Sequence, residues 1–317
     1  MIKGRNIRNK IVDAADPTKI KRATIASVYV TALIVSLLSI ILIITLCVNH
    51  FSGPQKVIGG SADGEGVFTL SYGDTKKGDL LVINKSSTAF DFSSNPEASL
   101  VCMSGEIPTV DGTYLYTLRN TEMKASRAAL TALNKMIEDF YAQSENKAAA
   151  TELYIWSAYR SLDTQNSLGT ATKGGHSDFH TGSLFELTYS GTATSISQNN
   201  AYDWLYKNAH KYGFIMRYPE AKSSITGVSD FDNAFRYVGI AHATYMLEND
   251  LCLEEYIQRL RSYNEENPLT ITVEGSTYSV YYVKADADVN TTIVTPSKNG
   301  TTISGDNAGG FIVTVKK

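Results

Sequence analysis

The sequence predicts an α+β protein that one helix anchors in a membrane. Three observations predict it: segments with apolar residues at helical spacing, short apolar runs typical of strands, and an uncharged run of 26 residues near the amino end. The predicted helices are 121–143, 202–212 and 242–263, and the predicted strands are 153–156, 214–217, 269–273, 278–283, 291–294 and 310–315. Residues 77–84 predict a turn followed by a buried strand.

The helix at 121–143 is predicted by one apolar face. Its members recur at steps of three and four residues, namely Leu130, Leu133, Met136, Ile137 and Phe140. The segment Tyr202–Tyr212 has the same periodicity and is followed by Gly213, a residue typical of helix ends. Both helices are expected to pack on a sheet, with 153–156 as a central strand.

The composition changes after Pro268. β-Branched and aromatic residues flank a turn at Glu274-Gly275-Ser276, which predicts a hairpin, and two further strands follow it. We therefore expect residues 266–317 to form a small β appendage, which either extends the main sheet or folds separately.

The uncharged run from Ala23 to Val48 predicts a membrane span. As a helix it would be about 39 Å long, enough to cross roughly 30 Å of hydrocarbon. Seven basic and two acidic residues precede it, so residues 1–22 are expected in the cytoplasm. We expect a single-pass signal anchor at residues 23–49, a linker at 50–69 and an extracytoplasmic main domain in the cell membrane; a cleavable signal is the alternative.

The charge of the outer part excludes one class of function. Of the 29 basic and 32 acidic residues, seven and two precede residue 23, which leaves a formal net charge of −8 for the rest. This charge predicts no nucleic-acid partner. Cys102 and Cys252 would face an oxidising compartment, but two cysteines 150 residues apart do not decide between a disulfide and two thiols.

Three stretches carry the most distinctive residues. They are Trp156–Ser161 with Gln165 behind it, Gly175–Glu186 (GHSDFHTGSLFE), and Gly213–Gly239, which holds RYP and FRYVG. In this order and spacing they resemble the VanY-type D-alanyl-D-alanine carboxypeptidases, zinc peptidases that trim peptidoglycan stem peptides. The resemblance implies helices packed on a central antiparallel sheet, with residues 70–265 as the carboxypeptidase domain.

The resemblance also shows where this chain departs from the family. Its two histidine ligands fall on Phe179 and Ala234, its aspartate ligand on Glu186, and its catalytic glutamate on Phe231. Phe and Ala have no lone pair for zinc, and Phe231 cannot accept a proton. We therefore expect no cofactor and no catalytic residue, and we expect Phe179, Phe231 and Ala234 to form a small apolar core in place of the metal.

A rearranged metal site is the alternative. His176 and His180 are four residues apart and Glu186 follows them, so these three could hold zinc if the stretch were helical. The flanking glycines favour a turn entering a strand instead. Under this alternative the protein would be an active metallocarboxypeptidase.

The residues that bind peptide in the family are unchanged in type. By the resemblance, Tyr159, Arg160, Gln165 and Ser177 would hold the terminal carboxylate and backbone of the peptide. A structural ion pair of Arg160 with Asp178 or Glu186 is the competing interpretation. The expected function is a pseudo-carboxypeptidase whose partner is the D-Ala-D-Ala end of a stem peptide or an envelope protein.

Overall fold

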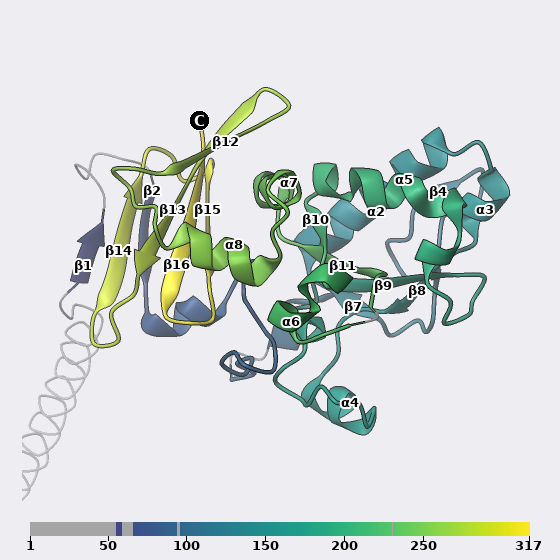
Figure 1. Ribbon diagram of the computed structural model, residues 1–317, viewed down its shortest axis with the longest axis horizontal. Coiled ribbons are helices and arrows are strands. Elements are labelled where there is room, and N and C mark those ends of the chain that lie inside the picture. The colour runs from purple at the N-terminus through teal and green to yellow at the C-terminus, as the bar shows by residue number, and fades with distance from the viewer. Residues whose placement is uncertain (1–54, 59–65, 94–95, 230) are drawn as a thin grey trace, which may run out of the picture. The chain divides into compact units, whose positions relative to one another are not determined.

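The computed structural model describes residues 55–58, 66–93, 96–229 and 231–317, and Gln55–Lys317 form one compact unit (Figure 1). The predicted tail, the predicted span and residues 50–54 and 59–65 of the predicted linker lie outside the described residues. Among the residues described, no helix is both long and apolar enough to cross a membrane.

A five-stranded sheet forms the centre of the unit. Its order is β10 (Phe214–Met216), β11 (Ala234–Tyr237), β9 (Leu184–Tyr189), β8 (Leu153–Ser157) and β6 (Thr117–Leu118). Neighbouring strands are antiparallel except β6 and β8, which are parallel. The predicted central strand 153–156 is thus confirmed, and Leu153 and Ile155 point into the core, as the period of two requires.

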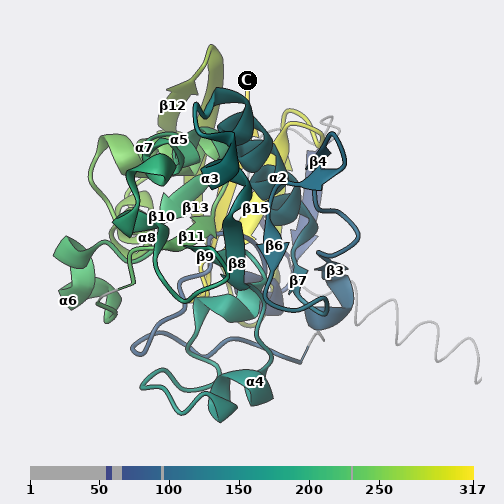
Figure 2. The same cartoon turned by 90° about the vertical axis from the view of Figure 1, so that its right-hand side faces the viewer.

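Helices cover one face of this sheet. The helix α2 (Arg127–Gln143) buries all five predicted apolar residues, and α3 (Lys147–Thr151) and α5 (Asp203–Asn208) lie on the same side (Figures 1 and 2). The helix begins six residues later than predicted, because the Ser126 side chain caps it by accepting a hydrogen bond from the Ala129 N–H. Lys124 and Ala125, just before the cap, form β7 instead, paired with β3 (Val101–Cys102).

The segment 202–212 is helical as predicted, although it changes type. After α5 it continues as the 3-10 helix η6 (Ala209–Tyr212) and ends at Gly213, whose φ is +83°. A side chain at Gly213 would place its Cβ 2.9 Å from the backbone of Gly239, so the close approach also requires glycine.

The predicted helix 242–263 is wrong as one element. The structure has α7 (Ile240–Glu248) and α8 (Leu253–Leu260), separated by a turn in which Asp250 has φ +50°. The amphipathic pattern continues across the break because both helices pack into the same core. There they cover one face of the sheet β12–β13–β16–β15 (Figure 1).

The carboxyl-terminal strands form a sheet separate from the five-stranded one, so they do not extend the main sheet. The sheet contains β12 (Leu269–Val273), β13 (Ser276–Lys284), β16 (Gly310–Lys316) and β15 (Thr301–Gly305). β15 was not predicted, because its sequence TTISG is polar and it lies at the edge. The hairpin turn at Glu274 and Gly275 is confirmed, since both residues have positive φ.

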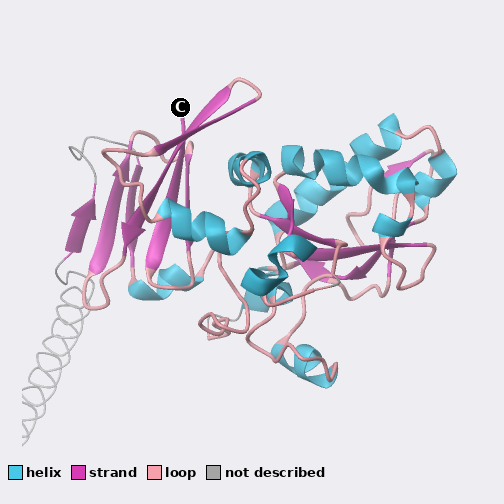
Figure 3. Cartoon of the chain, viewed as in Figure 1, coloured by secondary structure: helices cyan, strands magenta, loops and turns pink. Residues whose placement is uncertain are grey.

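The predicted linker is also wrong in part. β1 (Gln55–Ile58) and β2 (Gly66–Leu70) flank β14 (Asn290–Thr295) in a three-stranded sheet (Figure 3). Phe68 and Leu70 pack against a core that includes Phe311 of β16. The strand does not stand out in the sequence, because its short alternation of apolar and polar residues lies among Gly and Ser residues.

The segment 80–83 is buried but forms no strand. Leu80, Leu81 and Ile83 are buried, and the Leu80 N–H donates to Ser304 Oγ at 2.8 Å instead of joining a sheet. Cys102 is exposed and Cys252 is buried, and both are free thiols.

The remaining elements are short. They are β4 (Thr109–Val110), β5 (Thr113–Tyr114), α4 (Leu162–Ser167), α6 (Ser223–Thr226) and the 3-10 helices η1 (Tyr72–Lys76), η2 (Pro96–Ser99), η3 (Asp178–Thr181), η4 (Ile196–Gln198), η5 (Asn200–Tyr202) and η7 (Glu220–Lys222).

A buried ion network joins the central sheet to α8. The Arg217 guanidinium, 0% exposed, forms a bidentate pair with Glu254 at 2.7 and 2.9 Å and a second pair with Asp178. Arg236 lies 3.8 Å from the other Asp178 oxygen. Burial disfavours the charge on Arg217, but Asp178 and Glu254 outweigh it and raise the pKa of Arg217. The network therefore depends on every charge keeping its partner.

Replacing Arg217 by Met should cost about 3 to 5 kcal/mol in the free energy of unfolding, because Asp178 and Glu254 would be buried without a partner. Urea unfolding measures the loss. Lys207→Met is the matched control, since its pair with Asp203 is exposed and little change is expected. The triple variant Arg217→Met/Asp178→Asn/Glu254→Gln should recover part of the loss; a single variant as stable as the control would contradict the role of the network.

His242 should make stability depend on pH. It is buried between Tyr256 OH (2.7 Å) and Thr314 Oγ1 (3.0 Å), and burial lowers its pKa from 6.5 to about 4. The neutral ring contributes stability that is fully present above pH 6.5 and lost as pH falls towards 4, by at most about 3 kcal/mol. Urea unfolding at several pH values should show this fall in the wild type and a shallower one in His242→Gln; parallel curves would contradict the assignment.

Candidate functional site

A cleft of about 350 Å³ opens where the three distinctive stretches meet. Arg160 follows β8, Ser177 and Phe179 come from the start of η3, and Glu186 comes from β9. The first and second stretches also meet through their backbones, since the Arg160 N–H donates to the Phe179 carbonyl at 3.2 Å. The fold thus brings together lining residues from Ile83 to Phe231, which are up to 148 positions apart.

Arg160 is held in place from several sides. Its Nε donates to Ser157 Oγ at 2.8 Å, its Nη1 to Gln165 Oε1 at 3.3 Å, and its Nη2 lies 3.5 Å from Glu186 Oε2. The centre of the guanidinium lies 3.6 Å from the centroid of the Phe179 ring, a cation–π contact. The predicted pair with Glu186 is therefore present, whereas the one with Asp178 is not, because Asp178 pairs with Arg217.

Gln165 supports this arrangement from behind. It is buried, and its amide donates to the Thr172 carbonyl at 2.9 Å while its oxygen accepts from Arg160. It therefore ties the loop after α4 to the guanidinium. Ser177 lines the cleft. Tyr159 does not line the cleft; burial, together with the nearby Glu97 carboxylate, raises the pKa of its hydroxyl.

Burial governs the charges of the central pair. It raises the pKa of Glu186 and lowers the pKa of Arg160, although their mutual attraction opposes both shifts. The burial of Arg160 and Glu186 therefore does not by itself make their ion pair a strong one. A distance of 3.5 Å is also long for a charge-assisted hydrogen bond.

The positions of the implied metal ligands form an apolar cluster. Phe179 and Ala234 are buried together with Leu184 and Tyr218, and Phe231 packs against them. The Phe179 and Phe231 rings lie 6.1 Å apart, and Phe231 stacks on Tyr218 at 5.6 Å and 12°. The predicted apolar core is confirmed.

These residues do not fit a zinc ion. Glu186 lies opposite Ala234 across β9 and β11, so one carboxylate faces a methyl group where a second ligand would be needed. Among residues 66–93, 96–229 and 231–317, no group of three His, Cys, Asp or Glu side chains is placed to hold a metal.

The alternative ligand set is not assembled. Both nitrogens of the His180 ring are occupied, since Nε2 accepts from the Gly175 N–H at 3.0 Å and Nδ1 donates to the Arg160 carbonyl at 2.7 Å. Burial lowers the pKa of His180, which favours this neutral form. His176 lines the cleft, but its Nδ1 is hydrogen-bonded to the Asn84 carbonyl at 2.9 Å.

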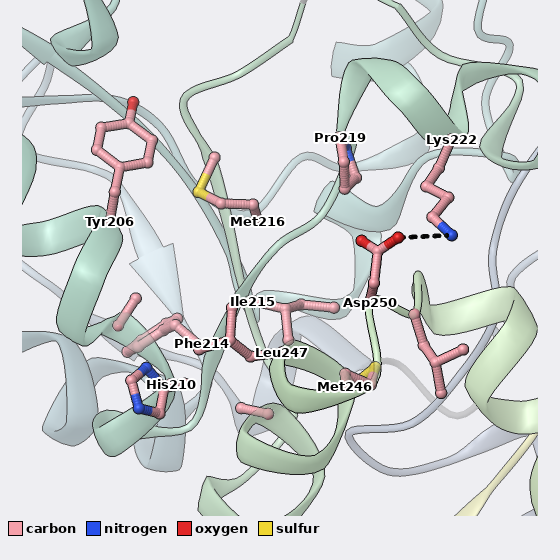
Figure 4. Close-up of a pocket in the computed structure, with 13 residues that line it drawn as sticks. Tyr206, His210, Phe214, Ile215, Met216, Pro219, Lys222, Met246, Leu247 and Asp250 are labelled. Carbon is pink, nitrogen blue, oxygen red and sulfur yellow. Dashed lines mark ion pairs between the residues drawn. The ribbon is translucent and has the colours of Figure 1, made fainter.

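A second cavity of about 740 Å³ lies on the other side of the aromatic stack. Glu186, Tyr218 and Phe231 line both cavities, so the side chain that replaced the catalytic glutamate forms part of the wall between them. A third cavity of about 120 Å³, between β10 and α7, has apolar walls and an ion pair of Lys222 and Asp250 at 3.4 Å (Figure 4). It lies away from all the predicted site residues.

The cleft contains cations that the sequence did not reveal. Lys85 and Arg119 line it together with Arg160, against the single carboxylate of Glu186. No motif marks Arg119 or Lys85, since each comes from a segment outside the three stretches. Arg119 reaches the cleft because the strand before it, β6, pairs with β8.

Comparisons with known proteins agree with this architecture. Residues 122–240 match the family model VanY: D-alanyl-D-alanine carboxypeptidase. A D-alanyl-D-alanine carboxypeptidase of Enterococcus faecium is 29% identical over 275 residues, covering 84% of this chain and 85% of that protein. One of Enterococcus faecalis is 51% identical over 59 residues, covering 19% of this chain and 22% of that protein.

A solved structure shows the same fold. The vancomycin resistance D,D-dipeptidase VanXYg, in complex with a D-Ala-D-Ala phosphinate analog, is similar with a TM-score of 0.65 and 26% identity. The match covers 79% of this chain and 98% of that one. The family model, these relatives and this likeness show that the chain is similar to the VanY-type D-alanyl-D-alanine carboxypeptidases.

Proposed function

We propose that this protein is a catalytically inactive, membrane-anchored member of the VanY-type D-alanyl-D-alanine carboxypeptidase family that binds the D-Ala-D-Ala end of peptidoglycan stem peptides without cleaving them. One observation carries the proposal. The cleft keeps the guanidinium of Arg160 with its supports, whereas carbon side chains fill the places of the implied zinc ligands and base.

The inactivity follows from the chemistry of hydrolysis. A zinc peptidase needs a metal-bound water and a carboxylate that takes its proton. Phe179 and Ala234 provide no ligand, and Phe231 turns an apolar ring towards Tyr218. Among the described residues that line the cleft, Glu186 is the one carboxylate, and it is paired with Arg160 rather than placed to take a proton from water.

Peptide binding is supported by the charge of the cleft. Three cations face one carboxylate, although the chain outside residues 1–22 is acidic overall. A ligand carboxylate would replace Glu186 at Arg160 Nη2, because the present pair is long and burial already favours the protonated form of Glu186. The complex of VanXYg with a D-Ala-D-Ala analog supports the choice of peptide end.

The location is proposed from the amino end. The uncharged run Ala23–Val48 would hold the domain at the outer face of the membrane, where peptidoglycan lies. No metal or other cofactor is part of the proposal.

Calorimetric titration with acetyl-Lys-D-Ala-D-Ala tests the binding. The wild-type outer domain, residues 55–317, should bind the peptide, and Arg160→Gln should weaken binding at least tenfold because the carboxylate loses its charged donor. The peptide amide should bind as weakly as the variant does. Lys207→Gln, an exposed charge outside the cleft, should bind like the wild type.

The absence of binding by the wild type, or equal binding by Arg160→Gln, would reject the peptide-binding role. A scaffold for an envelope protein would then be the remaining function.

Restoring ligands tests the loss of the metal. Phe179→His/Ala234→His should bind about one equivalent of zinc, because it adds two donors beside Glu186, and adding Glu186→Gln should weaken that binding. Metal analysis of the purified proteins measures this. The wild type should contain no stoichiometric zinc and release no D-Ala; zinc at one equivalent in the wild type would reject the proposed inactivity.

A further inference from the structure

Arg119 occupies a fixed position in the cleft. It follows β6, and its backbone N–H donates to the Ile155 carbonyl at 3.1 Å, so the strand pairing with β8 sets where its side chain starts. The centre of its guanidinium lies 4.1 Å from the centroid of the Trp156 ring. Trp156 and Arg119 both line the cleft. The stack therefore forms part of the binding surface.

The side chain of Arg119 has no hydrogen bond or ion pair to the residues that the structure describes. In this it differs from the other six arginines of residues 55–317. Each of these six donates a hydrogen bond to at least one other residue. They are Arg127 (to Glu106), Arg160 (to Glu186), Arg217 (to Asp178 and Glu254), Arg236 (to Asp79), Arg259 (to Tyr245 and Asn249) and Arg261 (to Asp306). Stacking holds a guanidinium by its face and leaves the N–H groups around its edge free to donate.

The cleft contains more positive than negative charge. Glu186 is nearest to Arg160 and pairs with it, so Arg119 and the exposed Lys85 have no carboxylate of their own in the cleft. Arg119 also repels the charge of Arg160. A second anion in the cleft would relieve this repulsion, because like charges in a partly desolvated site cost more than they do in water.

We propose that the cleft recognises a peptide with two carboxylates: the carboxyl end at Arg160 and a side-chain carboxylate, a few residues upstream, at Arg119 on Trp156. The inference rests on the proposed function, since the ligand is taken to be a stem peptide. Arg119 then acts as a specificity-determining residue, which selects among stem peptides by the charge of an upstream residue. A bidentate pair between guanidinium and carboxylate fits the free edge of the stack.

Two pairs of synthetic peptides test the proposal. Each pair ends in D-Ala-D-Ala and carries Glu or Gln at the third or at the fourth residue from the carboxyl end. The readout is the fluorescence of Trp156 in Trp204→Phe, because Trp156 and Trp204 are the two tryptophans of the chain and Trp204 packs in the core. Circular dichroism checks that each variant is folded.

The Glu peptide of at least one pair should bind about tenfold more tightly than its Gln partner. The preference should weaken with added salt, since part of the site is exposed. Arg119→Gln, in the Trp204→Phe parent, should remove the preference and bind the Glu and Gln peptides of each pair equally. Arg119→Lys should keep part of the preference, and Lys207→Gln, an exposed charge elsewhere, should keep all of it.

Equal binding of the Glu and Gln peptides in both pairs would overturn the second carboxylate and leave the proposed function standing. A preference that persists in Arg119→Gln would overturn the role of Arg119. Failure of every peptide to bind would reject the proposed function and this inference together.

Discussion

The buried pairing of Arg217 with Asp178 and Glu254 is the constraint on which the site depends. It joins three elements that are distant in sequence, because Arg217 follows β10, Asp178 begins η3 and Glu254 lies in α8. Asp178 immediately precedes Phe179, so the same contact places the ring that lies under Arg160. Moving charges out of water costs free energy. The network is tolerated because each buried charge is attracted to an opposite charge on another element.

An apolar cluster fills the part of the cleft where the resemblance implies metal ligands. A zinc ion would supply positive charge and tie η3, β9 and β11 together through its bonds. Here the Phe179 and Phe231 rings link the same elements through apolar contacts, and the face of Phe179 stabilises the Arg160 guanidinium. Glu186, which would face a cation of charge +2, has the charges of Arg160 and Arg119 near it instead, and burial raises its pKa.

Much of the fold could be predicted from local pattern. The apolar face of α2, the strand at 153–156 and the stop at Gly213 follow from side-chain periodicity and from backbone geometry, which act over a few residues. The break between α7 and α8 could not be predicted, because both helices keep one apolar face towards the same core. The strand pairing of residues 55–58 and 66–70 with β14 was missed for a related reason: their partners lie more than 200 residues away.

The sequence by itself determined which side chains carry the chemistry: Arg160, Gln165 and Ser177 are present, and Phe179, Phe231 and Ala234 cannot bind a metal or take a proton. These are properties of residue type, so no fold can alter them. The tertiary structure decided which groups face one another. It turned Tyr159 towards Glu97, paired Arg160 with Glu186, and left Arg119 stacked on Trp156 without a carboxylate among the described residues. Such pairings depend on distances between segments that are remote in sequence, and local patterns do not encode those distances.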